Sequence, residues 1–414
     1  MSCSSSKRFT TESDGIEEKN KIDNILNNES DITSEFRISE SGTIRVLLNE
    51  YTSSKTVRLE STVDFISGNS KLAIVNRGNE IQIKPSSNSL NVSIRDRRYV
   101  LNEFILSPAG EENIIVIDGK KYKGKIKISN AGGNLIFINQ ISLEDYVKGV
   151  MLKEMPLGKG NENYEALKAF SICVRTYAFT KIFERKLQYD ILPDTRDQVY
   201  GGVEGESELS NKIVDETRSQ ILTFKNQPAV IFYHSTCGGI TEDASNVFSN
   251  VNVTYLKSII DGSPANCTIS PRYSWTEIIP EYQIINRLQK SGYLNSNNYS
   301  VKTVSINSRF KSGRVNELEI RLSSSHREEK SVKLFGNNIR SVIRTADDKS
   351  ILRSNFFEIS GQSGGNIILK GRGAGHGVGL CQWGAISLSR TGLDYKRILA
   401  HYYPGTEIQT IDDK

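Results

Sequence analysis

A glutamate on an apolar helix face is the residue in this sequence best placed to do acid–base chemistry. Glu154 follows Val147, Val150 and Met151 at helical spacing, and Pro156 disfavours helix at the residue before it, so Glu154 should close the helix. Burial and the helix dipole at that end both raise the pKa of a carboxyl group. A carboxylic acid that stays protonated near neutral pH suits a general acid acting on a glycosidic oxygen. A glutamate reaching solvent from a frayed helix end would fit the same position.

Two cations follow on the next predicted helix. Lys168 and Arg175 are seven residues apart, which places them on one helical face. They could hold an anionic or hydroxyl-rich ligand, or tune a nearby carboxylate. A solvated helix face would show the same spacing.

A histidine and a cysteine lie near the end of a predicted strand. His234 and Cys237 could begin a metal site, but the sequence offers no convincing third and fourth ligand. A thiol nucleophile is the less favoured interpretation, and Cys267 is a candidate disulfide partner of Cys237. None of the five cysteines forms a CxxC pair. We therefore predict no metal and no cofactor.

The stretch that is densest in glycine surrounds His376. Residues 371–379 lack the Gly-Lys-Ser/Thr of a phosphate-binding loop and fit GxGxxG poorly. The glycines should allow turns with positive φ, or a close approach of the backbone to a polymer. Because glycines flank His376, its imidazole could equally be a functional group or a buried core side chain.

The elements that must position these residues follow from the hydrophobic pattern. We predict an antiparallel β-rich part from short apolar runs punctuated by turn residues, at 44–48, 71–75, 80–83, 114–117, 125–128 and 135–138. Further strands are expected at 230–233, 318–322 and 366–369. Helices are expected from a capping-box-like start at Ser142 to Glu154, and at 164–186, 381–388 and 395–402. The fold class is therefore α+β.

Composition limits the class of partner. The net charge is +5, with 24% charged residues, which falls short of the clustered basic excess of a nucleic-acid binder. No run approaches the roughly 18 apolar residues that a membrane span needs, and no signal peptide is visible. Residues 1–35 are polar and predict a flexible leader or tether. Cys3 within it is either the acylated cysteine of a bacterial lipoprotein or a chance residue in a disordered terminus.

Four segments, in order, make the sequence recognisable. They read LEDYVKGV running into EMP at 143–156, EALKA running into VRTYA at 165–178, YHSTCGG at 233–239, and GHGVGLCQWGA at 375–385. Together they resemble the stage II sporulation protein D (SpoIID/LytB) family. Ser312–Val315 and the β-rich lead-in also look like this family. The resemblance covers most of the chain after the leader.

The resemblance implies a peptidoglycan lytic transglycosylase with a glycan-binding cleft. Such enzymes cleave the β-1,4 bond between N-acetylmuramic acid and N-acetylglucosamine and leave a 1,6-anhydro end. The family pattern places the catalytic acid on Glu154 and supporting basic residues on Lys168 and Arg175. It places substrate-binding residues on Tyr177, Tyr233, His234, His376 and Gln382.

The implied reaction needs one carboxylate rather than the two of an ordinary glycosidase, because the sugar's own C6 hydroxyl attacks C1. The recognised motifs contain no paired acid, although Asp190, Asp194 and Asp197 are not excluded. Some relatives bind zinc through Cys and His in the segment that corresponds to 189–200. This chain has neither there, so we expect no zinc at that loop.

Three functions are consistent with these residues and with the resemblance. The first is the lytic enzyme, with residues 1–35 as leader, 36–140 as a β-rich part and 141–407 as the catalytic core. The second is a peptidoglycan-binding enhancer of an amidase, and the third is a structural envelope lipoprotein. The expected partners are glycan strands and other cell-wall hydrolases, with no nucleic acid and no membrane contact beyond a lipid anchor at Cys3. The expected location is extracytoplasmic.

Overall fold

The computed structural model describes residues 42–110, 113–183, 188–324 and 328–411. These residues form a mixed α+β fold with mostly antiparallel sheets and, within the described chain, seven α-helices, which confirms the predicted fold class. Two compact units can be distinguished. The N-terminal unit holds residues 42–231 with 392–398 and 405–411, and the C-terminal unit holds 232–391 with 399–404.

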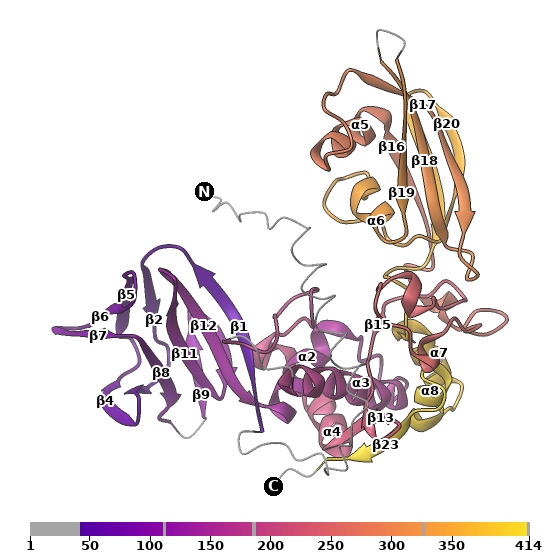
Figure 1. Ribbon diagram of the computed structural model, residues 1–414. Helices are drawn as coiled ribbons and strands as arrows, with labels where there is room; N and C mark the ends of the chain where they lie inside the picture. The colour runs from indigo at the N-terminus through magenta and orange to yellow at the C-terminus, as the bar shows by residue number, and fades with distance from the viewer. Residues whose placement is uncertain (1–41, 111–112, 184–187, 325–327, 412–414) are drawn as a thin grey trace. The chain divides into compact units, whose positions relative to one another are not determined.

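The N-terminal unit begins with two antiparallel sheets and a hairpin (Figure 1). The six-stranded sheet has the order β1 (Thr43–Tyr51), β12 (Asn134–Ser142), β11 (Lys125–Ala131), β8 (Glu103–Pro108), β3 (Val63–Ser67), β4 (Ser70–Val75). The four-stranded sheet has the order β2 (Lys55–Arg58), β5 (Glu80–Pro85), β6 (Leu90–Ile94), β7 (Arg97–Leu101), and the hairpin pairs β9 (Ile114–Ile117) with β10 (Lys120–Lys123). Burial alternates along β5, as expected for strands with one face toward a core.

The helix that carries the candidate acid follows β12 directly. In α2 (Leu143–Glu154), the Ser142 side chain accepts a hydrogen bond from the Asp145 N–H, which caps the first turn. The helix ends where Met155 becomes extended ahead of Pro156. Both predicted boundaries of α2 are confirmed, and α2 contacts the β1–β12 edge of the sheet.

The rest of the N-terminal unit packs around α3 (Tyr164–Phe183). Thirteen residues of α3 are buried, so this helix lies in a core rather than on a surface. It contacts α2, α4 (Glu208–Glu216) and β13 (Gln220–Phe224). Strand β13 lies between β14 (Gln227–Pro228) and β23 (Glu407–Thr410).

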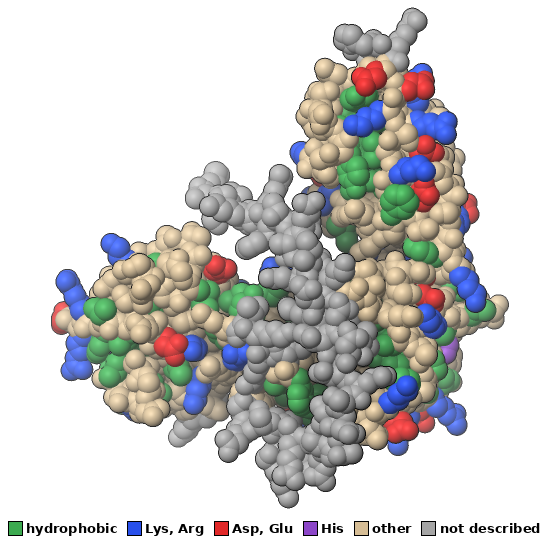
Figure 2. Space-filling view, in the orientation of Figure 1, with side chains coloured by type: hydrophobic (Ala, Val, Ile, Leu, Met, Phe, Trp, Pro, Cys, Tyr) green, Lys and Arg blue, Asp and Glu red, His purple; other side chains and the backbone are tan. Residues whose placement is uncertain are grey.

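The C-terminal unit is built around two three-stranded antiparallel sheets. One has the order β16 (Ser274–Pro280), β21 (Asn366–Arg372), β20 (Phe357–Ser363), and the other β17 (Tyr299–Arg309), β18 (Val315–Ser324), β19 (Glu329–Phe335). Helices α5 (Glu281–Lys290) and α6 (Asn338–Ile343) contact these sheets and close one hydrophobic core. On the face seen in Figure 2, Lys and Arg side chains are interspersed with Asp and Glu over β17–β19. Lys333 of β19 forms an ion pair with Glu317 of β18.

The chemistry-bearing motifs of this unit meet at a short parallel pair. Strand β15 (Tyr233–His234) pairs with β22 (Leu380–Cys381), and α7 (Gln382–Arg390) follows β22 directly. The 3₁₀ helices η2 (Ala244–Asn246), η3 (Thr254–Leu256) and η4 (Asn266–Ile269) lie between β15 and β16. Helix α8 (Tyr395–Tyr402) follows α7.

Most of the elements expected from the hydrophobic pattern are present. The six predicted N-terminal strands, the strands at 318–322 and 366–369, and the helices near 381–388 and 395–402 are confirmed. The strand expected at 230–233 is wrong over Val230–Phe232, because β15 comprises only Tyr233 and His234. The predicted leader and Cys3 lie outside the described residues. No described helix is long and apolar enough to cross a membrane.

Candidate functional site

Glu154 closes α2 and is half-buried. Its Oε1 atom accepts a hydrogen bond of 2.7 Å from the backbone N–H of Val199. This amide belongs to the segment 190–201, and Val199 lies 45 residues further along the chain. This main-chain donor fixes the orientation of the carboxyl group without itself titrating.

The segment 190–201 is braced on the helices and on β1. The Tyr146 hydroxyl of α2 donates to the Gln198 side chain at 3.0 Å, and Gln198 is fully buried. The Tyr200 ring stacks on Tyr146 with 5.2 Å between centroids, and Gly201 N–H donates to the Gly149 carbonyl of α2. These bonds hold the residues on both sides of Val199, so the amide that contacts Glu154 is fixed in position.

Each of the three aspartates in this segment has an established partner. Asp190 is a buried ion-pair partner of Arg45, with 2.6 Å between Nη2 and Oδ1. Asp194 pairs with Arg196, which lowers the pKa of Asp194 chiefly through the side-chain hydrogen bond. Asp197 accepts from the Tyr177 hydroxyl at 2.6 Å, from the Leu192 N–H and from Lys181. These contacts brace the segment, and Tyr177 takes part in them.

Lys168 lies in α3 within an aromatic and acidic surrounding. Its ammonium group pairs with Glu216 at 2.7 Å and lies 4.9 Å from the Tyr164 ring centroid and 5.7 Å from that of Tyr395. Tyr164 also donates to Glu216, at 2.6 Å. The hydrogen bond from Lys168 is the main cause of a lowered pKa for Glu216. These contacts of Lys168 are all made within its own unit.

Arg175 is fully buried in α3, a setting that helical spacing did not predict. Its guanidinium forms a bidentate ion pair with the carboxylate of Glu144, with hydrogen bonds of 2.8 and 2.7 Å. It also donates to the carbonyls of Gln220 and Val214, at 3.1 and 3.3 Å. Four of the five guanidinium N–H groups are thus used inside the N-terminal unit. The geometry gives Arg175 the position of a residue that holds α2, α3, α4 and β13 together.

In the C-terminal unit, His234 holds the glycine-rich segment. Its Nδ1 bonds the Val378 carbonyl at 3.0 Å, while Nε2 is buried with no hydrogen-bond partner among the described residues. Burial is the main cause of a pKa well below 6.5, with His376 and Arg314 adding to it. A neutral imidazole that donates from Nδ1 presents Nε2 as an acceptor.

His376 is tied to the backbone through both ring nitrogens. Nε2 donates to the Tyr233 carbonyl at 3.0 Å, and Nδ1 accepts from the Val378 N–H at 3.0 Å. Burial, and then the nearby Arg340, lowers the pKa of His376 to about 3. The ring makes edge contacts with Phe248 and Phe232, which stack at 4.1 Å, and all three rings are half-buried.

The glycines around His376 serve the chain's own packing. Gly375 has φ of 106°, and a Cβ there would lie 2.7 Å from the His234 Cβ. Gly379 has φ of 67°, and a Cβ there would lie 2.1 Å from the Phe232 carbonyl oxygen. The predicted positive φ values are confirmed, and the close approaches in the structure are to residues of the same unit.

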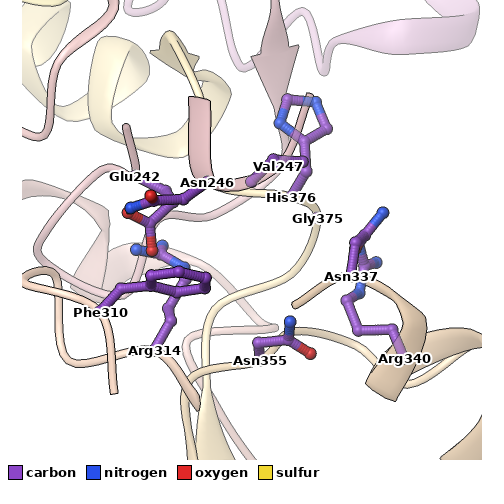
Figure 3. A pocket seen from close by; sticks show the side chains of 10 residues that line it. All are labelled: Glu242, Asn246, Val247, Phe310, Arg314, Asn337, Arg340, Asn355, Gly375 and His376. Carbon is purple, nitrogen blue, oxygen red and sulfur yellow. The ribbon is translucent and has the colours of Figure 1, made fainter. Parts of the chain in front are cut away.

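A small pocket opens beside His376 (Figure 3). Arg314, Arg340 and Glu242 contribute its charged groups, and all three are buried. Arg314 donates to the Cys237 carbonyl at 2.7 Å, and its Nε and Nη1 are buried without a hydrogen-bond partner in the described chain. In the sequence, Arg314 is indicated only by its place in residues 312–315, which resemble the SpoIID family. Glu242 carries no local signal, because its partner Ser312 lies 70 residues away.

The structure shows which side chains lie next to Cys237, which the sequence did not reveal. Cys267, Cys381 and Asp261 surround it, and all four residues are buried. The sulfur atoms of Cys237 and Cys267, the candidate disulfide pair, are 3.4 Å apart without a disulfide bond. The three residues around Cys237 could ligate a metal together with it, whereas His234, the other residue of the expected pair, is not part of this group.

The predicted site residues fall into two groups. Those of the N-terminal unit are Glu154, Lys168, Arg175 and Tyr177, and those of the C-terminal unit are Tyr233, His234, His376 and Gln382. Within the first group, α2, α3 and the segment 190–201 form one hydrogen-bonded framework. Within the second, Tyr233, His234 and His376 join across β15 and the glycine-rich segment, and Gln382 is buried at the start of α7.

Family models of known proteins match one segment in each unit. A family described as "Stage II sporulation protein" (SpoIID) matches residues 131–224, and a "Domain of unknown function" matches 257–379. The chain is 30% identical to stage II sporulation protein D of Bacillus amyloliquefaciens over 302 residues, covering 66% of this chain and 76% of the relative. The chain therefore belongs to the SpoIID family.

Two further relatives extend the comparison. An uncharacterized protein of Brachyspira hyodysenteriae is 33% identical over 300 residues, covering 70% of this chain and 73% of the relative. The amidase enhancer of Bacillus subtilis is 27% identical over 424 residues, which covers 92% of this chain but only 52% of the relative. The SpoIID match contains Glu154, Lys168, Arg175 and Tyr177, whereas the match at 257–379 contains His376.

Proposed function

We propose that this protein is a peptidoglycan lytic transglycosylase in which Glu154 acts first as general acid and then as base. Membership of the SpoIID family, whose members process the cell wall, supports this substrate class. The observation that carries the proposal is the setting of Glu154. It is a half-buried carboxyl group at a helix end, oriented by a main-chain donor from a braced segment.

The reaction follows from this setting. Glu154 gives its proton to the bridging oxygen as the bond from C1 of N-acetylmuramic acid breaks, and the electron pair leaves with that oxygen. The C6 hydroxyl of the same sugar then attacks the oxocarbenium-like C1, and its proton passes to the ionised Glu154. No water is consumed, so no second carboxylate is needed. The Val199 N–H on Oε1 stabilises the ionised form between the two steps, and we assign the transferred proton to Oε2.

Other residues of the N-terminal unit support the acid rather than touch the sugar. Tyr177 and Gln198 hold the segment that carries the Val199 amide. Arg175 and Lys168 act as positioning residues, because each is paired with an acid of its own unit. Asp190, Asp194 and Asp197 are paired in the same way, which supports a reaction with one carboxylate.

For substrate contact we look to the half-buried aromatic group in the C-terminal unit. Phe232, Phe248 and His376 present half-buried rings, and pyranose sugars pack their C–H faces on such rings. Because both ring nitrogens of neutral His376 already bond to the backbone, this residue would act on a sugar through packing, not as a cation. Tyr233 and Gln382 remain proposed contacts of the same segment, and His234 orders it from within.

The substrate implies an extracytoplasmic setting, with glycan strands and other cell-wall hydrolases as partners. Anchoring through a lipid on Cys3 is part of this proposal. We propose neither a nucleic-acid partner nor any other membrane contact.

The second candidate function is that of an enhancer that binds peptidoglycan and stimulates an amidase. Two observations favour it: the long alignment with the amidase enhancer, and the burial of Arg175, which removes it as a ligand-facing cation. In that case Glu154 would be a structural residue at a helix end.

Mass spectrometry of digested glycan strands tests the proposal. Purified protein should release muropeptides with 1,6-anhydro ends, and Glu154→Gln should lower the rate by about 10²–10⁴ while binding to sedimented peptidoglycan is retained. The side-chain amide introduced by this substitution could still accept from the Val199 N–H but could not donate an acidic proton. Glu208→Gln removes an exposed carboxylate in the same unit and serves as the matched control.

Each outcome decides between the two functions. Loss of anhydro ends in Glu154→Gln alone supports the enzyme. Undiminished cutting by Glu154→Gln refutes the assigned acid. Binding and stimulation of an amidase, without new anhydro ends from the parent protein, would establish the enhancer instead.

A further inference from the structure

Three cysteines and an aspartate from distant parts of the chain meet in the C-terminal unit. Cys237 follows β15, Cys381 ends β22, and Asp261 and Cys267 belong to the segment around η4. One ligand atom from each of the four lies within 4.8 Å of all the others, and all four residues are buried. We propose that Cys237, Asp261, Cys267 and Cys381 bind one structural Zn²⁺ ion.

The distances suit a tetrahedral ion. Zinc–sulfur bonds of about 2.3 Å place the sulfur atoms of a tetrahedron roughly 3.8 Å apart. The Cys237 and Cys267 sulfur atoms are 3.4 Å apart, and the Cys237 sulfur lies 3.0 Å from Asp261 Oδ2. Small outward shifts of these side chains would therefore open a site for the metal. Thiolate-rich, four-ligand, fully enclosed sites are typical of structural zinc.

The surroundings of Asp261 direct one of its oxygens at the cysteines. Oδ1 accepts from Tyr402 at 2.9 Å, Asn266 at 3.0 Å and His401 at 3.1 Å. Oδ2 is left facing Cys237. Hydrogen bonds that fix the orientation of a ligand in this way are the usual outer shell of a metal site.

The sulfur atoms are surrounded by N–H groups that stabilise thiolates. Cys237 Sγ accepts from the Gly239 N–H at 3.2 Å. Cys381 Sγ accepts from the N–H groups of Cys237 at 3.2 Å and Gly384 at 3.3 Å, the second at the start of α7, where the helix dipole favours negative charge. These donors suit sulfur ligands that carry charge in a dry interior.

A dication would balance the negative charge of ionised thiol and carboxylate ligands in this buried cluster. Buried Arg314, which donates to the Cys237 carbonyl, supplies positive charge beside the ionised ligands.

The space beside the cluster is filled at Gly384 of α7. A Cβ on Gly384 would lie 2.1 Å from the Tyr402 hydroxyl and 2.5 Å from Asp261 Oδ2. The proposed ion therefore has four protein ligands and no open position for substrate. Its role would be to fasten β15, β22 and the η4 segment to one another, separate from the reaction proposed for Glu154.

Metal analysis of the full-length protein tests this site directly. Protein expressed with zinc in the medium should contain one equivalent of zinc by plasma mass spectrometry. Cys267→Ser and Cys381→Ser should each lose most of it, whereas Cys173→Ser, which changes a buried thiol of α3, should retain it. Refolding with Co²⁺ should give the near-ultraviolet charge-transfer band of thiolate ligation.

The parent protein alone can overturn the proposal, even if a variant fails to fold. Absence of zinc together with a Cys237–Cys267 disulfide in non-reducing peptide maps would replace the metal site by a disulfide. Absence of the cobalt–thiolate band would exclude sulfur ligation. Equal loss of zinc from Cys173→Ser and Cys381→Ser would show that the metal is bound elsewhere.

Discussion

Removal of Arg175 should destabilise the fold before it affects any chemical step. The side chain is fully buried and forms its ion pair with Glu144, whose side chain is 7% exposed. In Arg175→Met, the carboxylate of Glu144 remains buried and keeps the Ser219 N–H, at 3.1 Å, as a neutral donor. Breaking one side of such a pair costs about 3–5 kcal/mol, because the remaining charge is uncompensated. For a unit of this size the midpoint of thermal unfolding should fall by roughly 6–20 °C.

A double variant separates charge from packing. In Arg175→Met with Glu144→Leu, neither charge of the pair is left, so the midpoint should recover by the equivalent of about 2 kcal/mol or more. Recovery should remain incomplete, since the carbonyls of Gln220 and Val214 and the Ser219 N–H each lose a partner.

Thermal and urea unfolding of the full chain are the assays, with Lys168→Met as the matched control on the same helix. The Lys168–Glu216 pair is partly exposed, so its loss should change stability by about 1 kcal/mol or less. Glycan cleavage is measured below the midpoint of every variant, where the double variant should retain turnover. If Arg175→Met unfolds like the parent but no longer cuts glycan, the structural role assigned to Arg175 is wrong and the residue acts in the reaction.

Three further predictions concern other parts of the molecule. Gln198→Leu leaves the Tyr146 hydroxyl without this acceptor and loosens the segment that carries the Val199 amide. The free energy of unfolding should fall by about 1–3 kcal/mol, and kcat should fall more than KM rises. An unchanged kcat would contradict this prediction. Unfolded His376 binds a proton as pH falls through about 6.5, but the folded residue stays neutral until its pKa of about 3. Stability should therefore decline as pH falls between these two values, and urea midpoints of His376→Gln should decline less steeply than those of the parent. Phe248→Ala removes one stacked ring and should weaken binding to sedimented peptidoglycan several-fold, with unchanged zinc content. Binding equal to that of the parent protein would refute this prediction.

Local signals allowed α2 to be predicted to the residue. The Ser142 cap acts within one turn, and Pro156 restricts its immediate neighbour, so both ends of the helix are determined by residues close in sequence. The short strand β15 was overextended because its apolar run, Val230 to Phe232, is buried or half-buried without joining a sheet. Hydrophobicity indicates burial, whereas pairing depends on β22, which lies more than a hundred residues away.

The site was less predictable because its contacts are long-range. The partner of Arg175 lies 31 positions earlier, on another helix, and spacing along α3 cannot reveal it. The backbone donors to Cys381 include Cys237, 144 positions away, so a search for closely spaced ligands could not find the cluster. Helical spacing and Pro156 located Glu154 at the end of α2, but its amide partner follows from the fold of residues 190–201 alone.

The amide that orients Glu154 has a consequence for how this protein can vary. Every residue except proline offers a main-chain N–H, so position 199 can exchange its side chain while the same donor still faces the carboxyl group. Substitution tolerance there should be wide, with proline as the single forbidden residue. A backbone contact of this kind places almost no constraint on which residue occupies position 199.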